Sequence, residues 1–369
     1  AINYFKDNDS FIEQLINTSL IKNNYLNNTF FTKSILDINV RKQQIVNNIL
    51  NINDTLDKSI HGHTEAKRQL ERIIGQWITG KQSGYCFGFE GAPGVGKTSL
   101  AKKGLSCCLK DADGKNRPFS FIALGGSCNG STLAGHNYTY VGSTWGKIVD
   151  ILMETKCMNP IIFIDELDKV SRTEHGKEII GILTHLVDST QNSGFQDKYF
   201  RGIDIDLSKV LFIFSYNDPS LIDKILLDRI HRVRFEHLDI DDKLEITKSY
   251  MLPEIYEKIG IAENTITLED DIIIFIIDYF TRESGVRKLR EILFEIISEI
   301  NLEILNGELI TTPLVLTKEM IKKKYLKDRH QVYYVKIHDK PNVGLINGLW
   351  ANAYGMGGII QIECNLTKT

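Results

Sequence analysis

The sequence lacks any pair of cysteines at the spacing of a disulfide framework or a structural metal site. None of its six cysteines forms a CxxC pair; they are Cys86, Cys107, Cys108, Cys128, Cys157 and Cys364. Scattered cysteines are typical of a reducing compartment, and we expect an intracellular protein of the cytoplasm or an organelle matrix. His61 and His63 form an HxH pair, but no third ligand follows at a useful spacing, so no zinc site is predicted.

The sequence also lacks an excess of charge and a long hydrophobic run. The net charge is −3 and the pI is near 6.4, so no bulk positive field favours binding to nucleic acid or to an anionic membrane. The longest apolar run, residues 272–280, contains Asp278 and is far too short to span a bilayer. No signal peptide is predicted, and because residue 1 is alanine rather than methionine, we expect a piece of a longer protein.

The composition is that of a globular protein, with 42% hydrophobic and 25% charged residues. A chain of 369 residues is too long for one ordinary core. Changes of pattern predict a helical linker over residues 1–55, which lack proline and glycine, and an α/β domain over 56–237. A helical domain follows over 238–326, and residues 327–369 read as the start of a third, β-containing domain.

Short runs rich in β-branched and aromatic residues predict five strands in the α/β domain, at 85–90, 119–124, 161–164, 210–215 and 233–235. Helical patterns such as 100–109 and 177–187 lie between them. This alternation predicts a parallel sheet with helices on both faces, and ligands of such sheets bind at the carboxyl ends of the strands. Further helices are predicted at 243–259, 270–280, 286–305 and 317–326, and strands at 332–337 and 358–364.

The strongest motif is a full match to GxxxxGK[ST], placed between a predicted strand and a predicted helix. It comprises Gly91, Ala92, Pro93, Gly94, Val95, Gly96, Lys97 and Thr98. Glycines let backbone N–H groups point at phosphate oxygens, and the helix N-terminus adds its positive end. Lys97 is expected to contact the β- and γ-phosphates and the Thr98 hydroxyl to ligate Mg²⁺, with Ser99 also near the nucleotide.

A second motif is the apolar run 161–164 followed by Asp165 and Glu166. The end of this strand is expected to deliver both acids to the ligand crevice. Asp165 would hold Mg²⁺, and Glu166 would orient and deprotonate the attacking water. A solvated acid at the end of a strand is the plain alternative, which the phosphate loop in the same domain disfavours.

Together these motifs make the chain resemble the ATPase module of a Lon-type AAA+ protease, most closely over about residues 57–300. The likeness to Lon rests on the runs 124–126 and 135–142, which resemble the family's LGG and GHxxTYIG, on 191–199, 206–208 and 226–229, and on 283–287. Local departures are Ala92 in place of a proline, Asn137 in place of an arginine, and Ser215-Tyr216 before Asn217.

The resemblance implies further site residues. Asn217 matches the polar sensor near the γ-phosphate, although Asn-Asp-Pro is also a common turn. Arg229 matches the arginine finger that acts on a neighbouring subunit, with a local ion pair to Asp228 as the alternative. Arg287 matches the second sensor. Ile60, His61 and Gly62 resemble the adenine-pocket segment, although a His-Gly turn is commonplace.

Tyr140 and Val141 resemble the aromatic–aliphatic pair of the first pore loop, which would grip unfolded protein through contact area. The alternative is a core tyrosine, which the flanking Gly135 and Gly142 disfavour because they suggest a loop. The Phe195 region is a candidate for the second pore loop.

The resemblance thus implies an ATP-hydrolysing motor, which binds ATP or ADP with Mg²⁺ and assembles into a homo-oligomeric ring, for which six members are expected. It would unfold and thread degradation-tagged or unfolded proteins. Residues 342–363 resemble the first hairpin of the family's proteolytic domain, and no serine follows residue 331, so we expect no Ser–Lys peptidase pair in these 369 residues. Alternatives are a stand-alone AAA+ remodeller of proteins or DNA, and a scaffold that binds nucleotide without hydrolysing it.

Overall fold

The computed structural model describes residues 43, 46–47, 49–79, 86–110, 115–125, 129–170, 173–307, 313–329, 341–351 and 357–364. The chain divides into two units, Ala1–Asp54 and Thr55–Thr369, and the architecture below is that of the second unit. Most of the predicted N-terminal helical linker lies outside the described residues. So does the predicted strand at 332–337.

The second unit contains the predicted parallel sheet of five strands, in the order β2-β3-β4-β1-β5. The strands are β1 (Cys86–Glu90), β2 (Phe119–Ala123), β3 (Ile161–Asp165), β4 (Leu211–Tyr216) and β5 (His231–Arg234). All neighbours pair in parallel. The sequence placed the last strand at 233–235; it begins earlier, because the polar residues His231 and Arg232 are tolerated in a strand at the edge of the sheet.

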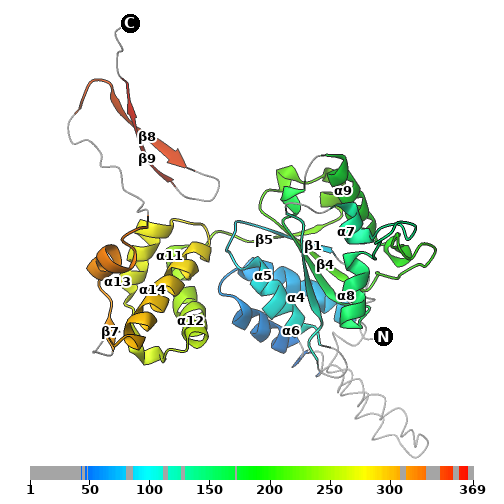
Figure 1. The fold of residues 1–369 in the computed structure, drawn as a ribbon, viewed down its shortest axis with the longest axis horizontal. Coiled ribbons are helices and arrows are strands. Elements are labelled where there is room, and N and C mark those ends of the chain that lie inside the picture. The colour runs from blue at the N-terminus through cyan, green and yellow to red at the C-terminus, as the bar shows by residue number, and fades with distance from the viewer. Residues whose placement is uncertain are drawn as a thin grey trace, which may run out of the picture. The chain divides into compact units, whose positions relative to one another are not determined.

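Helices cover both faces of this sheet, as predicted. Along one face lie α4 (Thr64–Thr79) and the consecutive segments α5 (Lys97–Ser99), η1 (Leu100–Leu105) and α6 (Ser106–Cys108), and along the other lie α7 (Gly130–Ala134), α8 (Lys147–Thr155) and α9 (Glu174–Val187) (Figure 1). β3 and β4 are buried on both sides, which explains why their sequences are continuously apolar rather than alternating.

Two aromatic side chains illustrate how the core is shared between strands. Phe89 of β1 and Phe163 of β3 are fully buried, with ring centroids 6.5 Å apart in a T-shaped arrangement. On the opposite face, Ile164 of β3 and Phe214 of β4 pack with Leu183 and Leu186 of α9. These layers hold the carboxyl ends of the central strands at fixed positions.

The helical domain has its own apolar core. Its helices are α11 (Ile240–Ile246), η5 (Thr247–Met251), α12 (Leu252–Ile259), α13 (Asp270–Ile276), η7 (Ile277–Thr281), α14 (Arg287–Leu305), α15 (Lys318–Met320) and η8 (Ile321–Tyr325), with the short turn η6 (Glu263–Thr265). The first of them begins before the predicted position 243, because Asp239 and Asp242 form a capping box at its start. The domain is not wholly helical, since β6 (Ile266–Thr267) pairs in parallel with β7 (Leu314–Val315).

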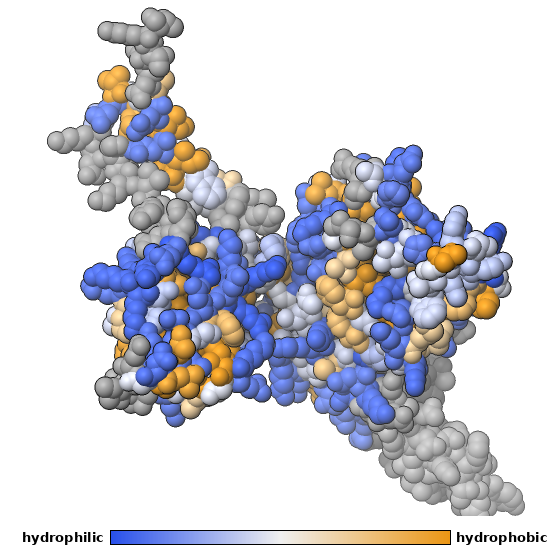
Figure 2. Space-filling view, in the orientation of Figure 1, coloured by the Kyte–Doolittle hydropathy of each residue, from blue (hydrophilic) through white to orange (hydrophobic). Residues whose placement is uncertain are grey.

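The predicted C-terminal hairpin is present as the antiparallel pair β8 (Leu345–Ala351) and β9 (Gly357–Glu363). Its Ile346, Leu349, Ile360 and Ile362 side chains are exposed, and Figure 2 shows hydrophobic surface on this hairpin. Among the described residues, no helix is long and apolar enough to cross a membrane.

Candidate active site

A cavity of about 520 Å³ opens at the carboxyl ends of β3 and β4, between the sheet domain and the helical domain. It brings together the predicted phosphate loop, both predicted acids, the predicted sensor and residues of the helical domain. The sequence-predicted residues that line it are Ile60, His61, Pro93, Gly94, Val95, Gly96, Lys97, Thr98, Ser99, Asp165, Glu166, Asn217 and Arg287.

The phosphate loop requires glycine at two positions. Gly94 and Gly96 have φ values of 80° and 101°, which L side chains rarely adopt. A Cβ on Gly94 would also lie 3.0 Å from the Cβ of Arg287. The helical domain approaches the loop even more closely at Gly285, where a Cβ would lie 2.4 Å from the carbonyl carbon of Gly94. Glycine at positions 94 and 285 therefore lets the backbone of the phosphate loop contact the backbone of the helical domain. A hydrogen bond joins them, in which the Val286 N–H donates to Gly94 O at 3.1 Å.

Lys97 is buried at the bottom of the loop, with 8% of the residue exposed. Its ammonium donates to the backbone oxygens of Gly91 at 2.5 Å and Tyr216 at 3.2 Å, and to Oδ1 of Asn217 at 2.8 Å. Burial lowers the pKa of Lys97 to about 8, although Asp165 and Asp168 oppose this shift. Gly91 and Ala92, which the sequence also predicted at the site, are not among the described residues that line the cavity. Gly91 contributes through its carbonyl oxygen, which holds Lys97.

The lowered pKa of Lys97 predicts a pH-dependent affinity for nucleotide. Only the ammonium form attracts phosphate, so above about pH 8 the free protein must take up a proton to bind. The dissociation constant of ADP is expected to rise by up to about tenfold per pH unit above that point. Calorimetric titration from pH 7 to 9.5 would measure it. Lys97→Arg, which stays charged, is expected to remove this dependence, and a flat wild-type profile would contradict the prediction.

The two predicted acids occupy the end of β3 in different conformations. Asp165 Oδ1 accepts the N–H of Glu166 at 2.9 Å. Glu166 has φ 61° and ψ 41°, in the left-handed region that a glutamate seldom adopts. Its Oε1 accepts a hydrogen bond from Lys169, which raises the pKa of that lysine. The unusual backbone turn of Glu166 and its ion pair place the carboxylate at the cavity wall.

Asp168 is a site residue that the sequence did not reveal. It lies in the short turn η2 (Leu167–Lys169), directly after Glu166, and its Oδ2 accepts the backbone N–H groups of Asn217 at 3.1 Å and Asp218 at 3.2 Å. The turn after β3 thus fixes the residue that follows β4. The Asn217 side chain in turn accepts a hydrogen bond from Lys97. Asp168, Asn217 and Lys97 therefore form one hydrogen-bonded set.

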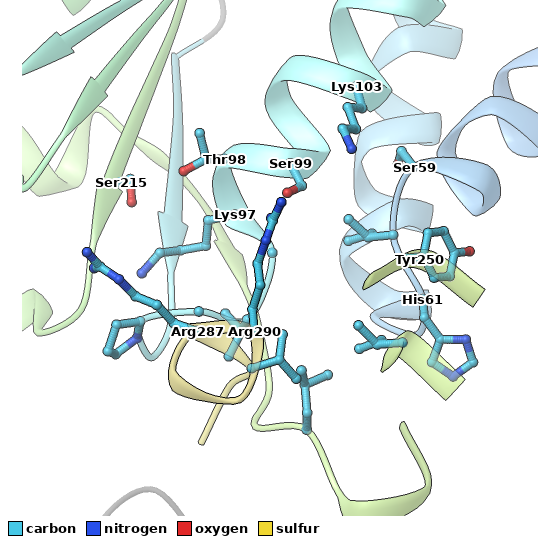
Figure 3. A pocket seen from close by; sticks show the side chains of 18 of the residues that line it. Ser59, His61, Lys97, Thr98, Ser99, Lys103, Ser215, Tyr250, Arg287 and Arg290 are labelled. Carbon is cyan, nitrogen blue, oxygen red and sulfur yellow. The ribbon is translucent and has the colours of Figure 1, made fainter. Parts of the chain in front are cut away.

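The helical domain contributes two arginines from α14. Arg287, which the sequence predicted, and Arg290, which it did not, lie one turn apart and both line the cavity. Figure 3 shows Arg287 on the side of Lys97 and Ser215, while Arg290 extends toward Ser99. Arg290 is held by Glu254 at 2.7 Å, and the other Glu254 oxygen lies 3.9 Å from Lys103, which follows the phosphate loop.

The predicted adenine segment forms the far wall of the cavity. Ile60 and His61 line it, whereas Gly62, with φ 67°, provides the turn and does not. His61 lies 3.3 Å from Asp242 of the helical domain. The next histidine, His63, donates from Nε2 to Val95 O at 2.9 Å, and burial lowers the pKa of its ring. Tyr250 stands beside His61 on this side (Figure 3).

Arg229 is not among the described residues that line the cavity. It follows α10 (Lys224–Asp228), and its Nη2 lies 3.2 Å from Oδ2 of Asp188, at the end of α9. The sequence analysis gave an ion pair with the adjacent Asp228 as the alternative role of Arg229; an ion pair is present, but its partner is Asp188. A residue 41 positions earlier in the chain could not be recognised as the partner from spacing.

The predicted pore residues lie away from the cavity, on the loop between α7 and α8. Tyr140 is 68% exposed and Val141 is fully exposed, so the alternative of a core tyrosine is wrong. Gly142, with φ 82°, has open space where a Cβ would be. Phe195, by contrast, is buried and its backbone pairs with Ile205, so this side chain belongs to the core.

Two family models match the chain. Residues 87–238 match the ATPase family associated with various cellular activities (AAA), and residues 257–312 match the Lon protease AAA+ ATPase lid domain.

Among curated proteins, the chain is similar to a Lon protease homolog of Acanthamoeba polyphaga mimivirus, with 32% identity over 86% of this chain and 36% of that protein. It is 38% identical to the Lon protease of Campylobacter concisus over 74% of this chain and 32% of that protein. It is 33% identical to the mitochondrial Lon protease homolog 1 of Dictyostelium discoideum over 84% of this chain and 31% of that protein. The chain therefore spans about a third of the length of these relatives.

Proposed function

Because this chain belongs to the Lon-type AAA+ ATPases, we propose that it is the ATP-hydrolysing motor of an ATP-dependent protease. The observation that carries the proposal is the convergence of Lys97, Asp165, Glu166 and Arg287 on one cavity. These residues come from the phosphate loop, β3 and the helical domain. Such a set serves phosphoryl transfer, where catalysis consists mainly of positioning and charge stabilisation.

Each side chain has a defined task in hydrolysis. Lys97 neutralises phosphate oxygens, and Asn217, held by Asp168, fixes the position of Lys97. The Glu166 carboxylate releases Lys169 and accepts a hydrogen bond from the attacking water instead. It then takes a proton from this water as the water oxygen attacks the γ-phosphorus. The bond from that phosphorus to the bridging oxygen breaks, and ADP and phosphate form.

The Thr98 hydroxyl and the Asp165 carboxylate are the residues that would hold Mg²⁺. Both line the cavity, and oxygen donors of this kind are those that Mg²⁺ prefers. The ion would supply positive charge to the phosphate oxygens when bound.

The lid would convert hydrolysis into movement. The Val286 N–H of this helical domain donates to Gly94 O of the phosphate loop at 3.1 Å, so a change at the phosphates would reach the helical domain directly. The exposed Tyr140 and Val141 would grip an unfolded or degradation-tagged polypeptide in the centre of a ring of identical chains, for which we propose six members. Arg229 would complete the site of a neighbouring chain, which is consistent with its position outside the described lining of its own cavity.

The proposal predicts Mg²⁺-dependent ATP hydrolysis by this chain. Removal of divalent metal with EDTA is expected to abolish phosphate release, and Mg²⁺ is expected to restore it. Lys97→Ala is expected to lose both nucleotide affinity and turnover. Phosphate release measured by a coupled assay, with Lys209→Ala as a control on the exposed residue at the opposite end of β4, tests this. Turnover that persists in EDTA or in Lys97→Ala would refute the proposal.

A further inference from the structure

Arg229 stands at a point where two helices end together. It caps the C-terminus of α10, where its N–H donates to Leu226 O at 3.1 Å. The end of α9 packs against this helix: Leu186 and Val187 share the buried core with Leu226 and Ile230. The backbone of Arg229 is therefore fixed, while its side chain is 37% exposed, so contacts of the guanidinium itself must set the orientation of the side chain.

Asp188 meets this side chain from the end of α9. It is 14% exposed, and its Oδ2 lies 3.2 Å from Nη2 of Arg229. Its Oδ1 accepts both the backbone N–H of Thr190 at 3.0 Å and the Thr190 hydroxyl at 2.7 Å. These Thr190 bonds, and next the charge of Arg229, lower the pKa of Asp188, so the carboxylate is anionic at neutral pH.

The backbone of Asp188 is held as firmly as its carboxylate. Its carbonyl oxygen accepts the N–H groups of Gln191 at 3.0 Å and Asn192 at 2.9 Å. One oxygen of the carboxylate is thus occupied by Thr190, and the other is aimed at the guanidinium. An ion pair on such a fixed support restricts the arginine far more than a pair between two mobile surface chains would.

We propose that Asp188 is the positioning residue of the arginine finger: it holds Arg229 in the orientation in which the guanidinium reaches the neighbouring chain's nucleotide. This inference rests on the proposed function, in which Arg229 acts in trans. Asp188 is not among the described residues that line the cavity of its own chain, so it would act through Arg229. It lowers the entropy that the arginine would lose on meeting the transition state.

The test compares Asp188→Ala, Arg229→Ala and the double variant at saturating ATP. Asp188→Ala is expected to lower kcat by on the order of tenfold, because the freed arginine must then lose its rotamer freedom during the reaction. The affinity for ADP is expected to stay unchanged. In the Arg229→Ala background the same substitution is expected to cause no further loss, because its effect passes through the missing guanidinium. Glu319→Ala, which breaks an exposed ion pair with Lys323 in the helical domain, is the matched control and is expected to have no effect.

Mixing chains separates positioning from damage to the fold. The Asp188→Ala chain keeps an intact nucleotide site, and the Lys97→Ala chain keeps an intact, positioned Arg229. The mixture is therefore expected to be more active than the sum of its two components measured separately. Asp188→Asn, which keeps the acceptor for Thr190 but loses the charge, is expected to show the same rescue. Full activity of Asp188→Ala, or a loss that adds to that of Arg229→Ala and is not rescued, would overturn the inference. An Arg229→Ala chain with wild-type activity would instead refute the finger itself, and with it the proposed action in trans.

Discussion

Replacing Glu166 with glutamine is expected to lower ATP turnover by a factor on the order of 10² or more, while ATP and Mg²⁺ still bind. Glutamine has the same shape, but it cannot accept the proton of the attacking water. The residues that hold phosphate, including Lys97 and its partner Asn217, are not changed. Single-turnover phosphate release and nucleotide titration on the same preparation would separate the loss of chemistry from the loss of binding.

The control for this variant is Glu154→Gln, which removes one carboxylate from an exposed position on α8 and outside the cavity. It is expected to retain wild-type turnover. Glu166→Gln also breaks the ion pair with Lys169, so Lys169→Met tests whether that pair, rather than proton transfer, matters. Turnover in Glu166→Gln within a factor of two of wild type would remove Glu166 from the role of general base.

Much of the fold could be predicted because its signals are local. Runs 161–164 and 210–214 are apolar throughout, as central strands covered on both faces must be, and all five expected strands are present. The edge strand β5 was placed less well, since solvent on one side relaxes the demand for apolar residues. The pair β6–β7 was missed because two residues per strand carry too little periodicity to recognise.

The candidate site could likewise be predicted where its signals are local, and not where they depend on tertiary packing. Phosphate-loop residues and the acids of β3 are adjacent in sequence, and their spacing reflects the geometry of one turn and one strand end. Asp168 and Asp188 were missed because their partners, Asn217 and Arg229, are distant in the chain and meet them only through the packing of strands and helices. Carboxylates that support other side chains have no spacing of their own.

The proposed arginine finger, Arg229, gives the largest expected effect of a side chain outside the cavity. Arg229 lies at the end of α10, paired with Asp188, and does not line the cavity of its own chain. A guanidinium supplied in trans to phosphoryl transfer contributes roughly 10³ to 10⁵ in rate. Arg229→Ala is therefore expected to reduce turnover to near background while leaving ADP affinity unchanged, measured against Lys209→Ala as the control.

If Arg229 acts in trans as proposed, turnover also depends on assembly. Below the concentration at which chains associate, each cavity lacks its finger, so wild-type specific activity is expected to fall on dilution, in step with the loss of oligomer seen by sedimentation. A mixture of Arg229→Ala with Lys97→Ala is expected to recover part of the activity, because a sound cavity then meets a sound finger in some pairs of neighbours. The maximum is expected near equal amounts, where such pairs are most frequent. If specific activity is independent of concentration and the mixture is as inactive as its parts, Arg229 acts within its own chain or through the fold, and the trans assignment fails.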